Sequence, residues 1–372
     1  MTDTTTADLQ ITLRGVGTAL HLGHIELDSE ATLNSLTLGM VRGIADALEL
    51  WRDDRSVVGV VITGAGDRAF CAGGDIQALY AAVTANHAAG ELVDPYAHTF
   101  FAEEYRLDHS LHIYPKPVIT LGHGIVMGGG MGLLSGSRYR VLTNRSRLAL
   151  PEVTIGLFPD AGATWTLRNT PVHWASFVGL TGCHLNAADA MLAGWGTHVI
   201  DHDQRAAHLD YLLALPWQAD AAQDAALLDE FYAGLQMASP PEGQLQVVPE
   251  QVVQMEDFAA EIARTRSLRG LSEWVDRGIA GMEAGCATTA GIVLEQLRRG
   301  PAMSLAETYQ MELVIGTHCA ENPEFAEGVR ALLIDKDLQP RWLYTLDSLD
   351  WDYVLSHFVA PWEEHPLADL SG

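Results

Sequence analysis

The chain has few cysteines and no long apolar segment. Its four cysteines lie far apart and form no CxxC motif, so we expect reduced thiols, with neither a disulfide framework nor a zinc site. No apolar run reaches the ~18 residues that span a bilayer, which predicts that this is not a membrane protein. Residues 1–9 lack both the basic-then-apolar order of a secretory signal and the arginine-rich character of a mitochondrial presequence. These absences together predict a cytoplasmic protein.

Positive charge is also scarce, because Lys and Arg number 22 against 48 Asp and Glu and give a net charge of −26. Long-range repulsion acts against nucleic acid and against anionic membranes. We therefore expect no nucleic-acid partner and no membrane partner. The hydrophobic content of 48% still supplies enough material for a packed core.

The pattern of apolar residues predicts the fold class. Residues 57–63 and 118–121 are continuously apolar, as strands buried on both faces are. Apolar side chains recur on one helical face over residues 36–51. The polar residues 85–98 predict a mobile loop. The repeated order of strand, glycine-rich turn and helix indicates an α/β fold.

The composition changes along the chain and predicts three parts. We expect a flexible N-terminus at residues 1–9, an α/β core at residues 10–200, and a helical region with an irregular tail at residues 201–372. The last part begins where the sequence becomes rich in Ala and Leu. Residues 239–243, with two prolines and a glycine, form the best linker candidate.

Two glycine-rich turns follow the two buried strands. We name them the first glycine turn, residues 70–75, and the second glycine turn, residues 128–130. Where a strand gives way to a helix, amide N–H groups are left free, and glycine lets a ligand approach them closely. Two such groups aimed at one point would stabilise an oxyanion. For either turn alone, a role only in tight turning and helix packing is the commoner interpretation. No dinucleotide-binding or P-loop motif fits these glycines.

Three acidic residues occur in apolar surroundings. Glu152 and Asp160 lie in the largely apolar residues 148–160, where burial should raise the pKa of Glu152 toward the range useful for proton transfer. The alternative for Glu152 is an acid that follows Pro151 and stabilises a helix N-terminus. Glu104 falls within the apolar stripe of a helix expected near residues 99–113. It is either a site residue or, more commonly, half of a buried salt bridge.

The order and spacing of these segments resemble the crotonase (enoyl-CoA hydratase/isomerase) superfamily, and most closely its 3-hydroxyisobutyryl-CoA hydrolases. The similarity runs from about residue 8 to residue 342 and is weakest near residues 201–250. It implies a spiral of ββα units with a C-terminal helical region. The segments that carry it are residues 69–76, 101–105, 123–130, 151–162 and 327–342.

The resemblance also implies roles for individual residues. The N–H groups of Gly74 and Gly129 would form an oxyanion hole for a thioester carbonyl. The carboxylates that would line the acyl pocket are Glu104, Glu152 and Asp160. The residues that would lie along the rest of coenzyme A (CoA) are Asn34, Ala72, Gly73, Lys336 and Arg341. The last two would contact its phosphates. No metal and no further cofactor are implied, since CoA is part of the substrate.

One departure separates this chain from the hydratases of the superfamily, which carry a glutamate shortly after the triple glycine. Here that position is Gly132, with no acid nearby. We therefore expect hydrolysis of a short 3-hydroxyacyl-CoA, most specifically 3-hydroxyisobutyryl-CoA to 3-hydroxyisobutyrate and CoA, a step of valine catabolism. Glu152 would either activate water or attack the carbonyl itself. Asp160 and Glu104 would hydrogen-bond the 3-hydroxyl and the water.

Two alternatives stay open at this point. An enoyl-CoA isomerase or hydratase on the same fold is the nearer one, because a single glutamate at position 152 could shuttle a proton. The other is a non-catalytic crotonase-like binding subunit, which the presence of Glu152, Asp160 and both glycine turns disfavours. The expected partner is a small-molecule acyl-CoA, and a homo-oligomer is possible.

Overall fold

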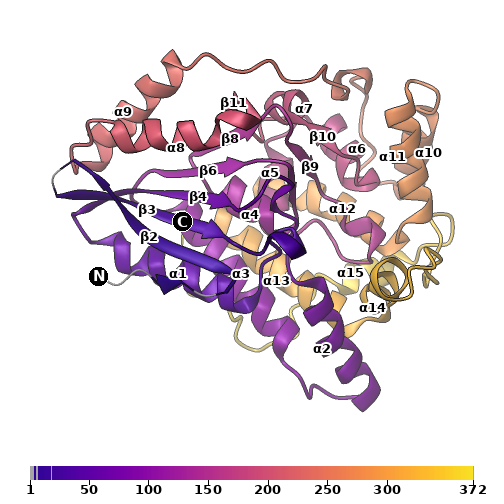
Figure 1. The fold of residues 1–372 in the computed structure, drawn as a ribbon. Helices are drawn as coiled ribbons and strands as arrows, with labels where there is room; N and C mark the ends of the chain where they lie inside the picture. Colours follow the sequence, from indigo (N-terminus) through magenta and orange to yellow (C-terminus); the bar gives the residue numbers. More distant parts are fainter. Residues whose placement is uncertain (1–3, 6, 18, 372) are drawn as a thin grey trace. The chain divides into compact units, whose positions relative to one another are not determined.

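The computed structural model describes residues 4–5, 7–17 and 19–371 (Figure 1). The chain forms two compact units, each made of three segments. The first unit consists of Met1–Gly74, Ser110–Leu148 and Leu185–Gly243. The second unit consists of Asp75–His109, Ala149–His184 and Gln244–Gly372. The expected flexible N-terminus, residues 1–9, lies partly outside the described residues, and the boundary expected at residue 200 stays a prediction.

The first unit is built on a seven-stranded sheet with the order β1-β2-β3-β4-β6-β8-β11 in the described part of the chain. β1 and β2 and then β2 and β3 pair antiparallel, whereas all later neighbours are parallel. The strands are β1 Thr4–Thr5, β2 Leu9–Val16, β3 Leu20–Leu27, β4 Val57–Gly64, β6 Val118–Gly122, β8 Tyr139–Thr143 and β11 His198–Ile200.

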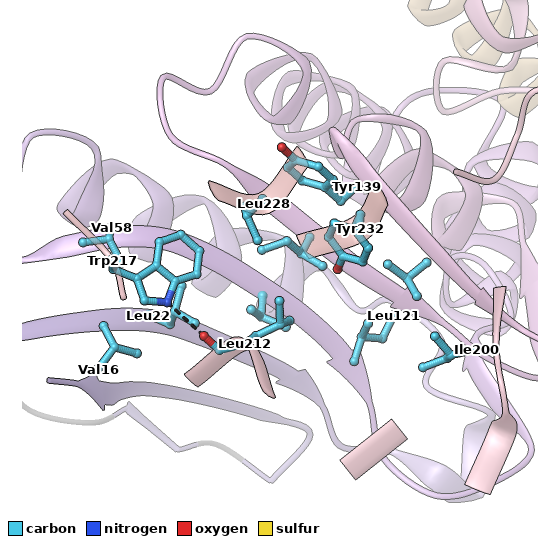
Figure 2. Close-up of a cluster of buried hydrophobic side chains, with 13 residues drawn as sticks. Val16, Leu22, Val58, Leu121, Tyr139, Ile200, Leu212, Trp217, Leu228 and Tyr232 are labelled. Carbon is cyan, nitrogen blue, oxygen red and sulfur yellow. Dashed lines mark hydrogen bonds between the residues drawn. The ribbon is translucent and has the colours of Figure 1, made fainter. Parts of the chain in front are cut away.

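Helices of the first unit cover both faces of this sheet (Figure 1). They are α1 Leu38–Arg52, α4 Gly129–Ser135, α7 Ala187–Leu192, α8 Arg205–Ala214 and α9 Ala221–Gly234. Neighbouring residues of β3 point to opposite faces. Gly23 leaves room for the ring of Trp51 from α1, whereas Leu22 belongs to a buried cluster with side chains of α8 and α9. Figure 2 shows this cluster, in which the Trp217 indole N–H donates to Leu212 O at 2.9 Å.

β4 shows why the α/β prediction succeeds. Val57 to Ile62 are all buried, because helices cover the sheet on both sides. A second, four-stranded sheet has the order β10-β9-β7-β5 and leads into the glycine turns. Its strands are β5 Ala69–Cys71, β7 Ile125–Met127, β9 Arg147–Ala149 and β10 Leu185–Asn186.

The second unit is mainly helical. Its longest buried helices are α12 and α13, and every residue from Ala287 to Leu297 of α12 is buried, as expected of a helix at the centre of a bundle. The helices are α2 Ile76–Ala89, α3 Tyr96–His112, α5 Ala163–Arg168, α6 Val172–Thr181, α10 Phe258–Ser267, α11 Glu273–Ala284, α12 Ala287–Arg299, α13 Leu305–Glu321, α14 Pro323–Val329 and α15 Trp351–Ser356. The last residues of α3, after His109, belong to the first unit.

The predicted α/β class and the helical C-terminal region are confirmed. The loop predicted at residues 85–98 is wrong at both ends, because α2 continues to Ala89 and α3 begins at Tyr96. The Asn86 side chain orders the short connection by accepting from the Asp94 N–H at 2.7 Å and donating to Asp94 O at 2.8 Å. Among the helices of the described residues, none combines the length and the apolar character needed to cross a membrane.

Candidate active site

The two glycine turns lie against each other in the first unit. β5 and β7 pair in parallel, with Cys71 opposite Val126, so both strands end at the same edge of their sheet. Gly73 has a φ of +107°, and an ideal Cβ there would lie 3.8 Å from the amide nitrogen of Gly129. Gly130 has no room for a side chain, since its Cβ would lie 2.5 Å from Cys71 O. Glycine is therefore required for the close approach of the two turns.

The amide groups proposed to bind an oxyanion are Gly74 N–H and Gly129 N–H. Gly129 is the first residue of α4, where N–H groups have no acceptor within the helix. The turns are held by other bonds, from Leu36 N to Gly73 O at 2.8 Å and from Met131 N to Gly128 O at 2.7 Å. Within the described ranges, neither Gly74 N–H nor Gly129 N–H takes part in these backbone bonds. Both amides are thus available to a ligand.

Asn34 forms hydrogen bonds with the backbone just before the first glycine turn. Its side chain is only 1% exposed, and its amide nitrogen donates to Ala65 O at 3.0 Å and to Ala69 O at 2.9 Å. The side chain thus holds the start of β5 and the loop before it. Ala72 and Gly73, expected with Asn34 along CoA, follow directly in the same turn. Their contact with CoA stays a prediction.

The second unit buries five carboxyl groups that lie close enough to alter one another's pKa. We name them the acid cluster. Each is at most 6% exposed. They come from α3, from the turn at Glu152–Thr154, from the loop before α5 and from α13. The members of the acid cluster are Glu104, Asp108, Glu152, Asp160 and Glu312.

Burial is the main reason that the pKa values of the acid cluster are raised. It raises the pKa of Asp160 to about 6 and that of Glu312 to about 8. It raises the pKa of Glu104, Asp108 and Glu152 well above the ordinary range, and repulsion from Asp160 adds to the effect. Among the described residues, no group of three or more His, Cys, Asp or Glu side chains is arranged to hold a metal ion.

Hydrogen bonds distinguish two members of the acid cluster from the others. Asp160 Oδ2 accepts from the Tyr105 hydroxyl at 2.9 Å, which lowers the pKa of Asp160 against the effect of burial. Both Glu312 oxygens accept backbone N–H groups. The others have buried oxygens without a hydrogen-bond partner among the described residues, namely Glu104 Oε1, Glu152 Oε2 and both carboxylate oxygens of Asp108. Such oxygens are available to substrate or water.

The structure thus brings together the three acids singled out from the sequence, Glu104, Glu152 and Asp160. Among the described residues Glu104 has no salt-bridge partner, and the charges acting on it are the repelling carboxylates of Asp160 and Glu312. Sequence reasoning missed two further acids. Asp108 follows Glu104 by four residues on α3, and this spacing could have identified it. No local signal marks Glu312, which comes from a distant helix.

Lys336 and Arg341 lie in one exposed segment of the second unit. Arg330 organises this segment through ion pairs with Asp335 at 2.6 Å and Asp337 at 2.8 Å, on either side of Lys336. Lys336 has a φ of 56°, in the left-handed region. Both cations are exposed, as phosphate contacts require, and this role stays a prediction.

Asp108→Asn should stabilise the protein at pH 8 and much less at pH 5. The pKa of Asp108 is raised well above 3.8, so the folded chain retains a proton that the unfolded chain releases. The free energy of unfolding then falls with rising pH, by about 1.4 kcal/mol per pH unit for one retained proton, between the unfolded and the folded pKa. Asn carries no such proton. Melting temperatures at pH 5 and pH 8 check this, and an equal shift at both would contradict it.

Comparisons with known proteins place these features in context. A family model described as enoyl-CoA hydratase/isomerase matches residues 22–358. A curated relative from Xenopus tropicalis, named 3-hydroxyisobutyryl-CoA hydrolase, mitochondrial, is 33% identical over 364 residues, covering 97% of this chain and 91% of the relative. The human protein of the same name is 34% identical over 324 residues, covering 86% of this chain and 81% of its own length.

Two solved structures resemble nearly the whole chain. A carnitinyl-CoA dehydratase from Mycobacterium thermoresistibile has a TM-score of 0.81 at 29% identity, covering 97% of this chain and 98% of its own. An enoyl-CoA hydratase from Rhodobacter sphaeroides has a TM-score of 0.78 at 29% identity, covering 94% and 97%. These similarities confirm the fold that the motifs predict.

Proposed function

The chain belongs to the enoyl-CoA hydratase/isomerase family, and on this premise we propose that it hydrolyses the thioester of a short 3-hydroxyacyl-CoA. The substrate we infer is 3-hydroxyisobutyryl-CoA, cleaved to 3-hydroxyisobutyrate and CoA in valine catabolism. Relatives of this name, 33% and 34% identical over most of their length, support this choice.

The observation that carries the proposal is the distribution of acids. α4, which begins within the triple glycine, contains no acidic residue. The second unit instead buries Glu152 and Asp160 together, both with a raised pKa. Addition of water across a double bond suits two acids on opposite sides of the water, one of them in the α4 position. Cleavage of a thioester needs one base or nucleophile, an oxyanion site and a group that binds the substrate hydroxyl.

The proposed chemistry assigns each group one step. The Gly74 and Gly129 amides polarise the thioester carbonyl and bind the oxyanion that develops on it. Glu152 either takes a proton from the attacking water and passes it to the departing CoA thiolate, or adds to the carbonyl carbon and forms a mixed anhydride that water then hydrolyses, the water supplying the proton of the CoA thiol. In both routes the C–S bond is broken and the products are the free acid and CoA. A pKa raised by burial makes Glu152 a stronger base than an exposed glutamate.

The remaining expectations are proposals of the same kind. Asp160 and Glu104 bind the 3-hydroxyl and the water, and Lys336 and Arg341 hold the phosphates of CoA against the net charge of −26. No further cofactor takes part. A cytoplasmic location stays a prediction, whereas the curated relatives carry the word mitochondrial in their names.

The purified protein should release free CoA from 3-hydroxyisobutyryl-CoA and from 3-hydroxypropionyl-CoA. It should hydrate crotonyl-CoA poorly, because Gly132 leaves α4 without an acid. A thiol-release assay and the loss of the enoyl absorbance measure the two reactions in parallel. Faster hydration than thioester cleavage would contradict the proposal and favour a hydratase. This is the alternative to test, because a solved enoyl-CoA hydratase is 29% identical to this chain.

A further inference from the structure

The backbone that carries Asp160 has an uncommon conformation. The two residues after it, Ala161 and Gly162, have φ values of 53° and 79°, in the left-handed region. An alanine there is strained and persists only where its surroundings impose the conformation. The α5 helix begins directly afterwards with Gly162 at its N-cap and no side-chain cap of its own. A backbone bond from Ala163 N–H to Asp160 O at 2.9 Å closes the turn, and further support comes from elsewhere in the chain.

Glu312 of α13 supplies this support. One carboxylate oxygen accepts Gly162 N–H at 2.7 Å and the other accepts Thr164 N–H at 2.9 Å. The side chain is 0% exposed. Glu312 thus caps α5 from another helix, with one backbone N–H bound at each oxygen. Both donors lie within four residues of Asp160.

A second contact from α13 fixes the same turn. Tyr309 lies one helical turn before Glu312, and an ideal Cβ at Gly162 would lie 2.5 Å from the Tyr309 hydroxyl oxygen. Only glycine fits between this hydroxyl and the left-handed backbone. Tyr105 of α3 meanwhile binds the Asp160 carboxylate at 2.9 Å. One helix therefore fixes the backbone of Asp160, and another orients its side chain.

We propose that Glu312 is a positioning residue for Asp160, whose carboxylate it aims at the substrate hydroxyl by fixing the turn at residues 161–164. This inference rests on the proposed function, because it assumes that Asp160 recognises that hydroxyl. Glu312 binds the Gly162 and Thr164 N–H groups and the Thr164 side chain, and it acts through Asp160. A role confined to folding would lower stability without changing the preference between substrates.

The test is Glu312→Gln, measured as kcat/KM for a 3-hydroxyacyl-CoA and for the matching unsubstituted acyl-CoA. Glutamine keeps the size but turns one acceptor into an NH2 group facing a backbone N–H. The preference for the hydroxylated substrate should fall by about 10-fold, as expected when one hydrogen bond to a charged group is lost. Glu261→Gln is the matched control, because it changes another buried glutamate that accepts a backbone N–H, from Gln254 at 2.9 Å, outside the acid cluster, and it should keep the preference.

A double-mutant cycle separates positioning from independent effects. In the Asp160→Asn background, Glu312→Gln should cause no further loss of preference. Suppose that the wild type is active. If the double variant then loses as much further preference as Glu312→Gln loses alone, or if Glu312→Gln alone leaves the preference unchanged, the inference is overturned and the proposed function stands. A wild type that cleaves neither substrate overturns the proposed function and this inference with it. If Glu312→Gln does not fold, Glu312→Asp, which keeps the carboxyl group and shortens the side chain, takes its place in the same cycle.

Discussion

Glu152→Gln should lower turnover of 3-hydroxyisobutyryl-CoA at least ~100-fold, the usual scale for removing a general base. Glu152 is 4% exposed, its Oε2 has no hydrogen-bond partner among the described residues, and its pKa is raised by burial and by Asp160. Glutamine keeps the volume and can neither accept the proton nor attack the carbonyl. Binding of the CoA ester, measured by calorimetry, should weaken far less than kcat.

A buried glutamate with a structural role provides the control for this variant. Glu261 is 0% exposed and pairs with Arg264 at 2.6 Å and with the Ser176 hydroxyl. Glu261→Gln should lower the melting temperature, because it weakens a buried ion pair, and should leave turnover nearly unchanged. Near-normal turnover in Glu152→Gln would contradict the catalytic role. Glu152 would then only stabilise the N-terminus of the turn at Glu152–Thr154.

The fold was largely predictable because its signals are local. The apolar run at residues 57–63 becomes β4, and the amphipathic residues 36–51 become α1 at Leu38–Arg52. The loop predicted at residues 85–98 failed for a physical reason. The polar composition of these residues is typical of a loop. However, the Asn86 side chain hydrogen-bonds the Asp94 backbone and orders the connection between α2 and α3. Side-chain bonds of this kind leave no periodic pattern in a sequence.

The candidate site was predictable only in part. Glu104 could be found from its place in an apolar stripe, and Glu152 and Asp160 from their apolar surroundings. Glu312 could not, because its partners Gly162 and Thr164 lie about 150 residues earlier in the chain. The sequence separation removes any local signal, and the role of a glutamate in a buried helix cannot be assigned until its hydrogen-bond donors are known. Asp108 lies between these cases, one helical turn from Glu104.

Asp160→Asn should impair cleavage of 3-hydroxyacyl-CoA much more than cleavage of the matching unsubstituted acyl-CoA. The Tyr105 hydroxyl donates to Asp160 Oδ2, and we propose that Oδ1 accepts the substrate hydroxyl. With a pKa of about 6, Asp160 is mostly ionised at pH 7.5 and can accept the substrate hydroxyl as a charged acceptor. Loss of a hydrogen bond to a charged group in a buried site costs roughly 1.5–3 kcal/mol, or about 10- to 150-fold in kcat/KM.

The competing explanation, that Asp160 only caps the following helix, predicts a different result. Asparagine caps a helix as well as aspartate does, so activity and melting temperature would both stay almost unchanged. The structure already disfavours capping, because the N-cap of α5 is Gly162 and no side-chain cap bond is present there. Steady-state kinetics on the two substrates at pH 7.5 provide the measurement. Equal losses on both would assign Asp160 to the shared chemical step and leave recognition of the hydroxyl to Glu104 or to the backbone.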